Sequence, residues 1–575
     1  MKLSDQQNNI AEAPLASLCV IACAGSGKTR TAVHRLAKIR TDMENQRAYV
    51  ALLSFTNTAV KTFTKCYTEI RNNTVPQGVD RVVIDTLDSF ITNNIIRPHA
   101  HREMKCKTTP FLISGSESFL NNEKYKYWFE DGGGRKRPVL PQQISNVSFR
   151  CIDDKWGFWV RENNNLYAVN NGSEVTQKIA RLGAYTHELG KYWVVMTLLN
   201  NKRLLRVLVN RYPHIIVDEA QDIDYLHGEI LKILSDAGAK IALIGDPHQA
   251  IYEFSGADGE FINDYSKSAE QNLPLSKNYR SIPNILSVAN SISGRNDDSE
   301  RNQNNIDFGA YYSVYERNNP QDIVDGFIVK LDALGLEKEN SAVLYRGHSG
   351  IKKILGLGGD LGQGKTKMFV LASIKRDQER NYHEAFNLVV SSLIELFENL
   401  PDDFSKLLIS DEGYRPLKQK IWIFIRNPAT GLPLASLDGK TKWHALLKQN
   451  VMTLLADIVT EYGFKACENI GRLLASTKLP DGPLIQDGDL FKNKGNSIRI
   501  DTVHQAKGES LDAVLYMPTD KSHLREMLDG TKTEVGRIGY VALTRAKDYF
   551  VLGVQKGWIK DFEDRLKELG FQEQN

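Results

Sequence analysis

The residues best suited to chemistry lie in two glycine-rich stretches that each end in Lys-Thr. The first is ACAGSGKT, from Ala22 to Thr29, and the second is GDLGQGKT, from Gly359 to Thr366. A loop of this kind cradles phosphate with backbone N–H groups, while its Lys reaches the β/γ-phosphates and its hydroxyl binds Mg²⁺. The second stretch fits the pattern G-x-x-x-x-G-K-[ST] at every position, whereas the first begins with Ala. The flanking elements must therefore decide between them.

A phosphate loop needs a buried strand before it and a helix after it, because the positive end of the helix faces the anion. SLCVIA (17–22) is a β-prone apolar run, and KTRTAVHRLAKI (28–39) has apolar residues at helical spacing. GDLGQGKT is preceded by the turn-like LGLGG and followed by MFVLAS (368–373), which predicts a strand. We therefore predict that GDLGQGKT is a flexible loop without a nucleotide role. The first stretch is the predicted nucleotide loop, with Ala24, Gly25, Ser26, Gly27, Lys28 and Thr29 as its binding residues and Thr29 also on Mg²⁺.

An NTPase also needs an acidic element, and HIIVDEAQD (214–222) supplies one after an apolar run. Asp218 is predicted to hold Mg²⁺ through water, and Glu219 to orient and deprotonate the attacking water. A second apolar run, IALIG (241–245), leads to Gln249, which can hydrogen-bond the γ-phosphate or the water. The alternative is that Asp-Glu after an apolar run only begins a loop.

Further candidates lie downstream, at Tyr279-Arg280 in LSKNYRS and at Arg545 in YVALTRAK. Two separated arginines in this order can supply cations to the γ-phosphate from across a domain boundary, although a lone Arg is usually a solvated surface charge. Tyr252 and Phe254 form either a stacking platform for bases or part of a core.

Composition sets wider limits. A chain of 575 residues predicts about three to five domains. Its 41% hydrophobic and 25% charged content is typical of a soluble protein, and no apolar run approaches a membrane span, so we expect a cytoplasmic protein with no membrane partner. The six cysteines include no C-x-x-C pair, and H-E-x-x-H is absent, so zinc has little support. A net charge of +3 neither requires nor excludes nucleic acid.

The ordered set of motifs resembles the UvrD/Rep helicases of superfamily 1. It runs LSDQQNNI, ACAGSGKT, LLSFTNTAV, IDTLDSF, IIVDEAQD, GDPHQAIYEFSGA, LSKNYRS, AVLYR, TVHQAKGES and YVALTRAK. The resemblance implies an ATP- and Mg²⁺-dependent enzyme that moves 3′ to 5′ on single-stranded or partly duplex DNA. It implies catalytic roles for Lys28, Glu219, Gln249, Arg280 and Arg545, adenine contacts for Gln7, Arg30 and Tyr279, and a ribose contact for Glu509. The DNA path it implies consists of Phe55, Thr56, Asn57, Thr86, Tyr252, Phe254 and His504.

Three positions depart from the family pattern. Phe254 stands where Trp is usual and is followed by Ser255 where Arg is common, which changes base stacking. Glu509 lies one position earlier than the Glu of the usual KGLEF, so the position of the ribose contact implied for Glu509 differs from the family pattern. Asp88 replaces a usual His that contacts DNA.

The KGES variant, the phrase NRYPHIIVDEAQD and the length are most similar to helicases of bacterial defence islands, such as the helicase-like subunit of Gabija antiviral systems. This resemblance implies a protein partner such as an OLD-type nuclease. The alternatives are a housekeeping repair helicase, an ATP-hydrolysing DNA sensor without productive unwinding, an inactive ATPase that only binds, and an RNA substrate.

The motif order predicts an α/β fold with two RecA-like parallel-sheet lobes, each with an inserted accessory subdomain. The first lobe is expected at 1–97 and 195–275, and the second at 276–355 and 488–575. The insertion at 98–194 contains SFRCIDDKWGFWVRENNNLYAV, which predicts β-strands around an Asn-rich turn, and that at 356–487 is predicted to be mostly helical.

Overall fold

The computed structural model describes residues 3–43, 46–74, 80–115, 117–152, 155–162, 165–253, 256–317, 319–347, 361–377, 380–401, 404, 407–408, 411–484 and 498–574. The chain divides into two compact units, each described here by itself. The first comprises Met1–His99, Val194–Ile354 and Phe491–Asn575, and the second comprises Ala100–Trp193 and Leu355–Leu490.

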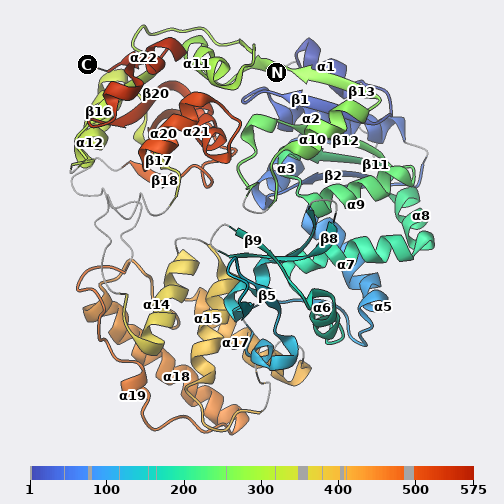
Figure 1. Ribbon diagram of the computed structural model, residues 1–575, viewed down its shortest axis with the longest axis vertical. Helices are drawn as coiled ribbons and strands as arrows, with labels where there is room; N and C mark the ends of the chain where they lie inside the picture. The colour runs from blue at the N-terminus through green and yellow to red at the C-terminus, as the bar shows by residue number, and fades with distance from the viewer. Residues whose placement is uncertain are drawn as a thin grey trace. The chain divides into compact units, whose positions relative to one another are not determined.

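The first unit contains a six-stranded parallel sheet with the order β13-β1-β12-β11-β2-β3 (Figure 1). Its central strands are almost continuously apolar and buried, as expected of a parallel sheet covered on both faces. The strands are β1 (Leu18–Ala22), β2 (Val50–Ser54), β3 (Val82–Thr86), β11 (His214–Asp218), β12 (Lys240–Gly245) and β13 (Gln271–Leu275).

The helices of this sheet follow the apolar periodicity of the sequence. Helix α2 packs on β2, β11 and α3, and Arg35 on its buried face donates to the carbonyls of Ile10 and Ala13 at 2.9 and 3.0 Å. This buried guanidinium holds α1 against α2, and so places Gln7 beside the start of α2. The helices are α1 (Asp5–Ala11), α2 (Lys28–Asp42), α3 (Asn57–Thr74), α4 (Leu87–Ile91), α8 (Lys202–Arg211), α9 (Tyr225–Asp236) and α10 (Glu260–Ser268).

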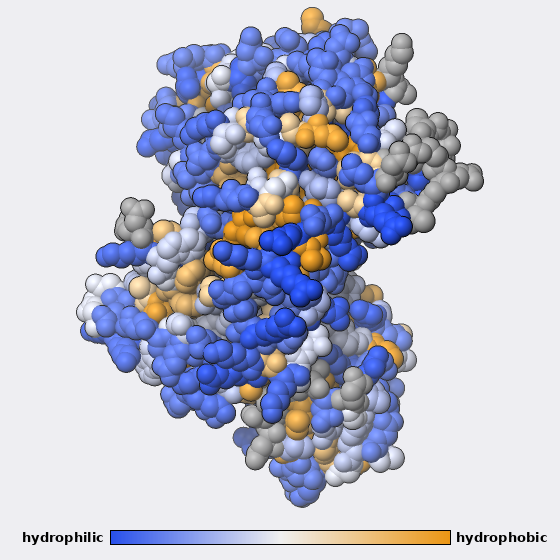
Figure 2. Space-filling model, turned by 90° about the vertical axis from the view of Figure 1, so that its right-hand side faces the viewer, coloured by the Kyte–Doolittle hydropathy of each residue, from blue (hydrophilic) through white to orange (hydrophobic). Residues whose placement is uncertain are grey.

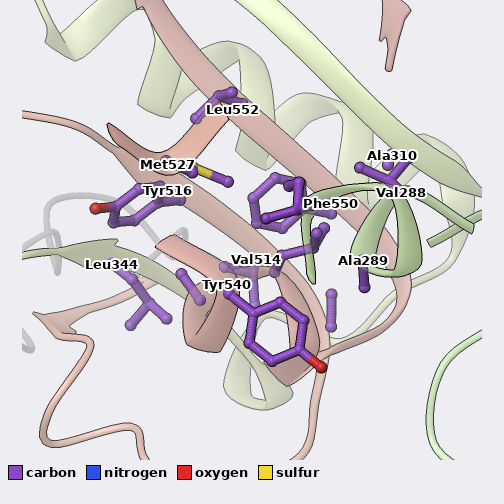
Figure 3. Packing of buried hydrophobic residues seen from close by; sticks show 14 of the residues in the cluster. Val288, Ala289, Ala310, Leu344, Val514, Tyr516, Met527, Tyr540, Phe550 and Leu552 are labelled. Carbon is purple, nitrogen blue, oxygen red and sulfur yellow. The ribbon is translucent and has the colours of Figure 1, made fainter. Parts of the chain in front are cut away.

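A second six-stranded parallel sheet lies in the same unit, with the order β18-β17-β19-β20-β16-β21. Val514 of β19 is in register with Phe550 of β20, and Figure 3 shows both among the buried side chains of this core, with Tyr540 nearby. The strands are β16 (Gly309–Tyr315), β17 (Ser341–Tyr345), β18 (Arg499–Thr502), β19 (Leu511–Met517), β20 (Ala546–Gln555) and β21 (Gln572–Glu573). The helices are α11 (Pro283–Ser293), α12 (Gln321–Leu334), α20 (Lys521–Asp529), α21 (Glu534–Arg545) and α22 (Ile559–Leu569).

The two parallel sheets confirm the predicted α/β fold class and are consistent with two RecA-like lobes. Helix α21 is buried at every position from Val535 to Arg545, because it packs on β19, β20 and α11 and also contacts the 3₁₀ turn Pro247–Gln249 that follows β12. Helix α21 therefore lies against the segment that follows β12 of the first sheet.

The 100–193 part of the second unit is built on short antiparallel strands, as predicted for SFRCIDDKWGFWVRENNNLYAV. Strands β7 (Val147–Ile152), β8 (Lys155–Glu162) and β9 (Asn165–Ala168) form one sheet, and β5 (Trp128–Glu130) pairs with β6 (Lys136–Pro138). The two-residue strands β4 (Phe111–Leu112) and β10 (Ala184–Tyr185) pair with each other in parallel. The helices are α5 (His101–Met104), α6 (Gly172–Ala180) and α7 (His187–Asn200), the last of which runs on into the first unit.

The 355–490 part is helical where it is described, around a core that includes the fully buried Trp443. The prediction of a strand at MFVLAS is wrong, because residues 368–373 lie inside α14. Its buried residues, among them Thr366, Phe369, Val370 and Ser373, recur at helical spacing and pack on α15, which an apolar run alone could not reveal. The helices are α14 (Gly364–Asp377), α15 (Tyr382–Ile394), α17 (Arg415–Arg426), α18 (His444–Tyr462) and α19 (Ile470–Leu473).

Figure 2 shows hydrophilic residues over most of the face it presents, with apolar residues in smaller areas. Among the described helices, none combines the length and the apolar character that crossing a bilayer would require. All six cysteines are free thiols.

Candidate active site

The predicted site residues of the first sheet lie at the carboxyl ends of three adjacent strands. In the parallel register Ile21 of β1 is opposite Gly245 of β12, and Asp218 of β11 is opposite Ile244. The loops that leave these strands therefore begin at one edge of the sheet. Ligands of open α/β sheets bind at this edge, where strand order reverses.

The loop after β1 has the geometry of a phosphate cradle. Gly25 and Gly27 have φ values of 70° and 80°, which a residue with a side chain rarely adopts. Ser26 donates to the carbonyl of Cys23 at 2.7 Å, and Lys28, only 9% exposed, begins α2. Half-buried Thr29 follows it, so the positive end of α2 and its Lys face the same space.

The second Lys-Thr stretch is engaged in other contacts. Gly359 and Asp360 lie outside the described residues, but Lys365 forms an ion pair with Glu395, and the Thr366 hydroxyl donates to the carbonyl of Ala475 at 2.7 Å. Both contacts lie within the second unit. A helix does follow GDLGQGKT, yet its Lys and Thr are used to pack that helix against its neighbours.

Asp218 is buried at the end of β11, and the half-buried Glu219 follows it. Burial, and next the Glu219 carboxylate, raise the pKa of Asp218 to about 7. Burial also disfavours the charge of Glu219, but Lys28 and Lys507 outweigh it and lower its pKa below the usual value. Glu219 has a φ of 54°, an uncommon conformation for a residue with a side chain, and such strain is typical of positions where a side chain must point at a ligand.

The residues fit a magnesium ion bound mainly through phosphate. Asp218 Oδ1 is buried and has no hydrogen-bond partner in the described structure, so this carboxyl oxygen is available to a cation or its water. No cluster of three or more His, Cys, Asp or Glu that could hold a metal occurs among the described residues. Mg²⁺ commonly uses one or two carboxylates together with substrate phosphates, and Asp218 with Thr29 can provide the protein part of such a set.

A chain of hydrogen bonds leads from the acidic pair to the second sheet. The Gln221 amide donates to Glu219 Oε2, and Gln221 Oε1 accepts from the backbone N–H of Asp246 at 3.0 Å. Gln249 Nε2 donates to Asp246 Oδ2 at 2.8 Å. Arg545 Nη2 at the end of α21 donates to Gln249 Oε1 at 3.0 Å. Gln221, Asp246, Gln249 and Arg545 are all at most 3% exposed, so this chain is shielded from water.

Arg280 joins Arg545 at the same place. Its Nη1 donates to the carbonyl of Thr544 at 2.9 Å, and its Nε donates to Ser510 at 2.7 Å. A Cβ placed on Gly25 would lie 2.5 Å from Arg280 Cβ, so the phosphate loop and this arginine are in direct contact. Burial, and then the charge of Arg545, lower the pKa of Arg280 to about 9, and burial also lowers that of Arg545. Two cations this close, the buried Arg545 and the half-buried Arg280, favour an anionic ligand.

The predicted adenine contacts surround the phosphate loop. Gln7 Nε2 donates to the carbonyl of Ser26 at 3.0 Å, and Gln7 Oε1 accepts from Ser4 N at 3.1 Å, which leaves one amide N–H and one lone pair for a base. Tyr279 is 40% exposed, and its backbone N–H donates to the carbonyl of Gly25 at 2.9 Å. Arg30 is half-buried on the first turn of α2. Glu509 forms an ion pair with Arg499.

The predicted DNA contacts are only partly exposed. Thr56 and Asn57 are exposed at the start of α3, and the half-buried Phe55 ring packs edge-on against His227 at 5.8 Å. Thr86 is 8% exposed, and its hydroxyl accepts from Ser89 N as the cap of α4. The other members of the set form a group of their own: the Tyr252 ring lies 5.6 Å from His504, whose Nε2 bonds the carbonyl of Ile251 at 2.8 Å, whereas Phe254 and Ser255 lie outside the described residues.

Two contacts between side chains of distant segments were not foreseen from the sequence. Lys507 Nζ lies 2.6 Å from Asp222 and 4.5 Å from the centroid of the Tyr252 ring, which links the acidic loop to the second sheet. His227 of α9 contacts Asp88 at 3.1 Å, so the residue that departs from the family pattern is bound to an imidazole from another element. The charged residues in DEAQD and HQAKGES were visible, but their pairing depends on contacts between distant segments.

The site combines one phosphate loop, an Asp-Glu pair at a strand end and two arginines, and its residues come from two parallel sheets. These features define the class of P-loop NTPases with paired RecA-like lobes. Residues 3–147 and 161–270 match the family model of the UvrD/REP helicase N-terminal domain, and residues 365–557 match that of the UvrD-like helicase C-terminal domain. The chain belongs to the UvrD/Rep family of superfamily 1 helicases, whose enzyme class is that of ATP-dependent DNA helicases.

Several curated proteins are similar to the chain. It is 22% identical to a probable DNA helicase II homolog of Mycoplasma capricolum, over 94% of this chain and 82% of that protein. It is 27% identical to DNA helicase II of Escherichia coli over 50% of this chain and 40% of that protein. It is 24% identical to the ATP-dependent DNA helicase Rep of Escherichia coli over 60% of this chain. The chain spans about half of the Rep protein, 52%.

The choice between the two Lys-Thr stretches can be tested directly. We expect Lys28→Ala to abolish ATP hydrolysis, because Lys28 is the cation at the start of α2, and Lys365→Ala to leave the rate close to wild type. Steady-state ATPase assays on both variants measure this. An equal loss of ATP hydrolysis in both variants would contradict the assignment of ATP binding to the first loop.

The buried pair Asp222–Lys507 has a pH signature. Burial raises the pKa of Asp222 from 3.8 to about 6, and Lys507 opposes this only in part. Since the folded state then binds the proton more tightly than the unfolded state, the stability that Asp222 contributes is fully present below about pH 4 and is lost as the pH rises through about 6. We expect the thermal midpoint of wild type minus that of Asp222→Asn to fall as the pH rises from about 4 through about 6, and to stay constant above pH 7. A difference that grows with pH would contradict the assignment.

Proposed function

We propose that this protein hydrolyses ATP and uses the energy to move 3′ to 5′ along single-stranded DNA, as a UvrD-type translocase and helicase. The observation that carries the proposal is the bond from Arg545 of the second sheet to Gln249 of the first, beside the phosphate loop. A cation supplied from one lobe to a nucleotide held by the other makes hydrolysis depend on lobe closure.

In the proposed mechanism each residue of the site has a defined role. Lys28 binds the β/γ-phosphates, and Arg280 and Arg545 stabilise the negative charge that develops on the γ-phosphate. Glu219, kept ionised by Lys28 and Lys507, orients the attacking water and accepts its proton. Thr29 and Asp218 would hold Mg²⁺, which supplies further charge neutralisation at the phosphates when bound.

The proposed coupling to DNA runs through the segment after Gln249. Ile251 lies two residues beyond it and accepts a hydrogen bond from His504 of the second lobe, and Tyr252 follows with its ring beside His504 and Lys507. Loss of the γ-phosphate removes the anion that Gln249 and Arg545 share. We propose that the lobes then separate and that Tyr252 and His504, with Phe55, Thr56 and Asn57, shift along the strand.

We further propose a role in bacterial anti-phage defence with a partner such as an OLD-type nuclease. The support is the KGES variant and the phrase NRYPHIIVDEAQD, which resemble defence-island helicases. A gene for such a nuclease beside this one and its co-purification from the native host would support the role. A position within a repair operon, and no co-purifying nuclease, would favour a housekeeping repair helicase.

A second candidate function is a DNA-sensing ATPase that does not unwind. Asp88, where the family usually has a DNA-contacting His, is engaged by His227, and the hydroxyl of Thr86, an expected DNA contact, caps a helix. Fewer contacts on the strand favour sensing over processive unwinding.

Arg545 offers a test of hydrolysis apart from binding. We expect Arg545→Ala to slow ATP turnover by about 10³-fold or more, with little change in nucleotide affinity, because this cation is needed mainly in the transition state. Single-turnover hydrolysis and binding of a fluorescent ATP analogue separate the two. A parallel loss of affinity and rate would contradict this role.

Strand displacement tests the proposed function itself. We expect ATP hydrolysis to be stimulated by single-stranded DNA and a duplex with a 3′ tail to be unwound faster than one with a 5′ tail. Stimulation without displacement of either duplex would identify the sensor, and the absence of any stimulation by DNA would contradict both functions.

A further inference from the structure

Five short strands of the 100–193 segment, β5 to β9, form one antiparallel layer. An isolated bridge pairs Phe129 of β5 with Val169, just after β9, and Asn170 N donates to Trp128 O at 2.8 Å. The strand order is therefore β6-β5-β9-β8-β7, and Figure 1 shows β5, β8 and β9 close together in the teal part of the chain. A layer of this kind has two faces, which alternate residue by residue.

One face of the layer is the core of this segment. Val147, Phe158, Val160 and Phe129 point to it and are buried, and the Phe149 and Phe158 rings pack on Tyr192 at 4.8 and 5.3 Å. The residues between them must point to the other side. The register assigns to this outer face Trp128, Lys136, Arg150, Lys155, Trp159 and Arg161.

The outer face carries flat aromatic surface as well as charge. A Cβ placed on Gly157 would lie 3.4 Å from Trp159 Nε1 and 4.0 Å from Cε2, so the indole lies across the sheet above a residue without a side chain. Lys136 Nζ lies 5.5 Å from the centroid of the Trp128 ring. Trp128 and Trp159 are half-buried, whereas Lys136 and Lys155 are exposed. If this outer face contacted only solvent, two tryptophan side chains would have no role there.

The charge of this face is mostly positive. Lys136, Arg150, Lys155 and Arg161 belong to it, against Glu130, which is paired with Lys136 across β5 and β6. Together with two indoles on the same face, these cations match a ligand that is rich in anionic groups and also has aromatic rings to stack.

We propose that this face, from Lys136 across Trp128 and Trp159 to Arg161, is a second binding site for single-stranded DNA. Phosphates pair with Lys136 and Arg161, and bases stack on the indoles, as on other sheet platforms for single strands. The identity of the ligand rests on the proposed function, since a DNA translocase presents such a strand.

Two adjacent exposed residues provide a matched test. Lys136 lies on the outer face, whereas Arg137 points to the other side, where it lies 3.5 Å from Glu162. Using the full chain and a long labelled oligo(dT), we expect Lys136→Glu to weaken binding about tenfold and to reduce the slope of log K against log salt by about one. Arg137→Glu makes the same change in net charge and should bind close to wild type.

Stacking has its own test in Trp128. We expect Trp128→Ala to weaken oligo(dT) binding by about tenfold and Trp128→Phe to restore most of it. The thermal midpoint and the ATPase rate without DNA should be unchanged, which shows that the fold is intact and separates a failure of this site from a failure of the motor. The proposal is overturned if Lys136→Glu and Arg137→Glu weaken binding equally, or if Lys136→Glu and Trp128→Ala both bind DNA normally.

Discussion

The hydrogen bond from the Arg545 guanidinium to Gln249 is the interaction on which the active site depends. Arg545 is 1% exposed at the end of a wholly buried helix, and burial without an anionic partner is costly for a cation. Its partners are an amide and backbone carbonyls, with the Glu219 and Asp246 charges favouring its protonated form. A phosphate between the lobes would complete this electrostatic balance.

The rest of the site follows from the way parallel strands end. Because β1, β11 and β12 are adjacent and parallel, the phosphate loop, the Asp218-Glu219 pair and Asp246 leave the sheet at the same edge. Uncommon backbone conformations at this edge orient the loop and the Glu219 side chain. Glycines at positive φ let the loop approach phosphate closely, and the left-handed conformation of Glu219 turns its side chain toward Gln221. A regular strand-to-helix connection could not have placed these groups together.

Local sequence patterns predicted many of the helices and strands, and they failed where packing between elements determines the structure. The SLCVIA strand and the helix at Lys28 followed from short apolar runs and their periodicity, as did the strands around SFRCIDD and WGFWV. MFVLAS was misjudged because six apolar residues fit a strand or a buried helix equally well, and contacts with α15 settled the choice. The roles of Glu509 and Asp88 also depended on partners, Arg499 and His227, that lie elsewhere in the chain.

The sequence by itself determined the class of chemistry, because a Lys-Thr loop, an Asp-Glu strand end and two arginines occur in a fixed order with the right neighbours. Only the tertiary structure decided which of these groups meet. Asp222 with Lys507 and Gln249 with Arg545 are pairings between segments far apart in the chain, and strand register brings two indoles to one face of a small sheet. Such pairings depend on strand register and on the packing of whole elements, and neither is encoded at any single position.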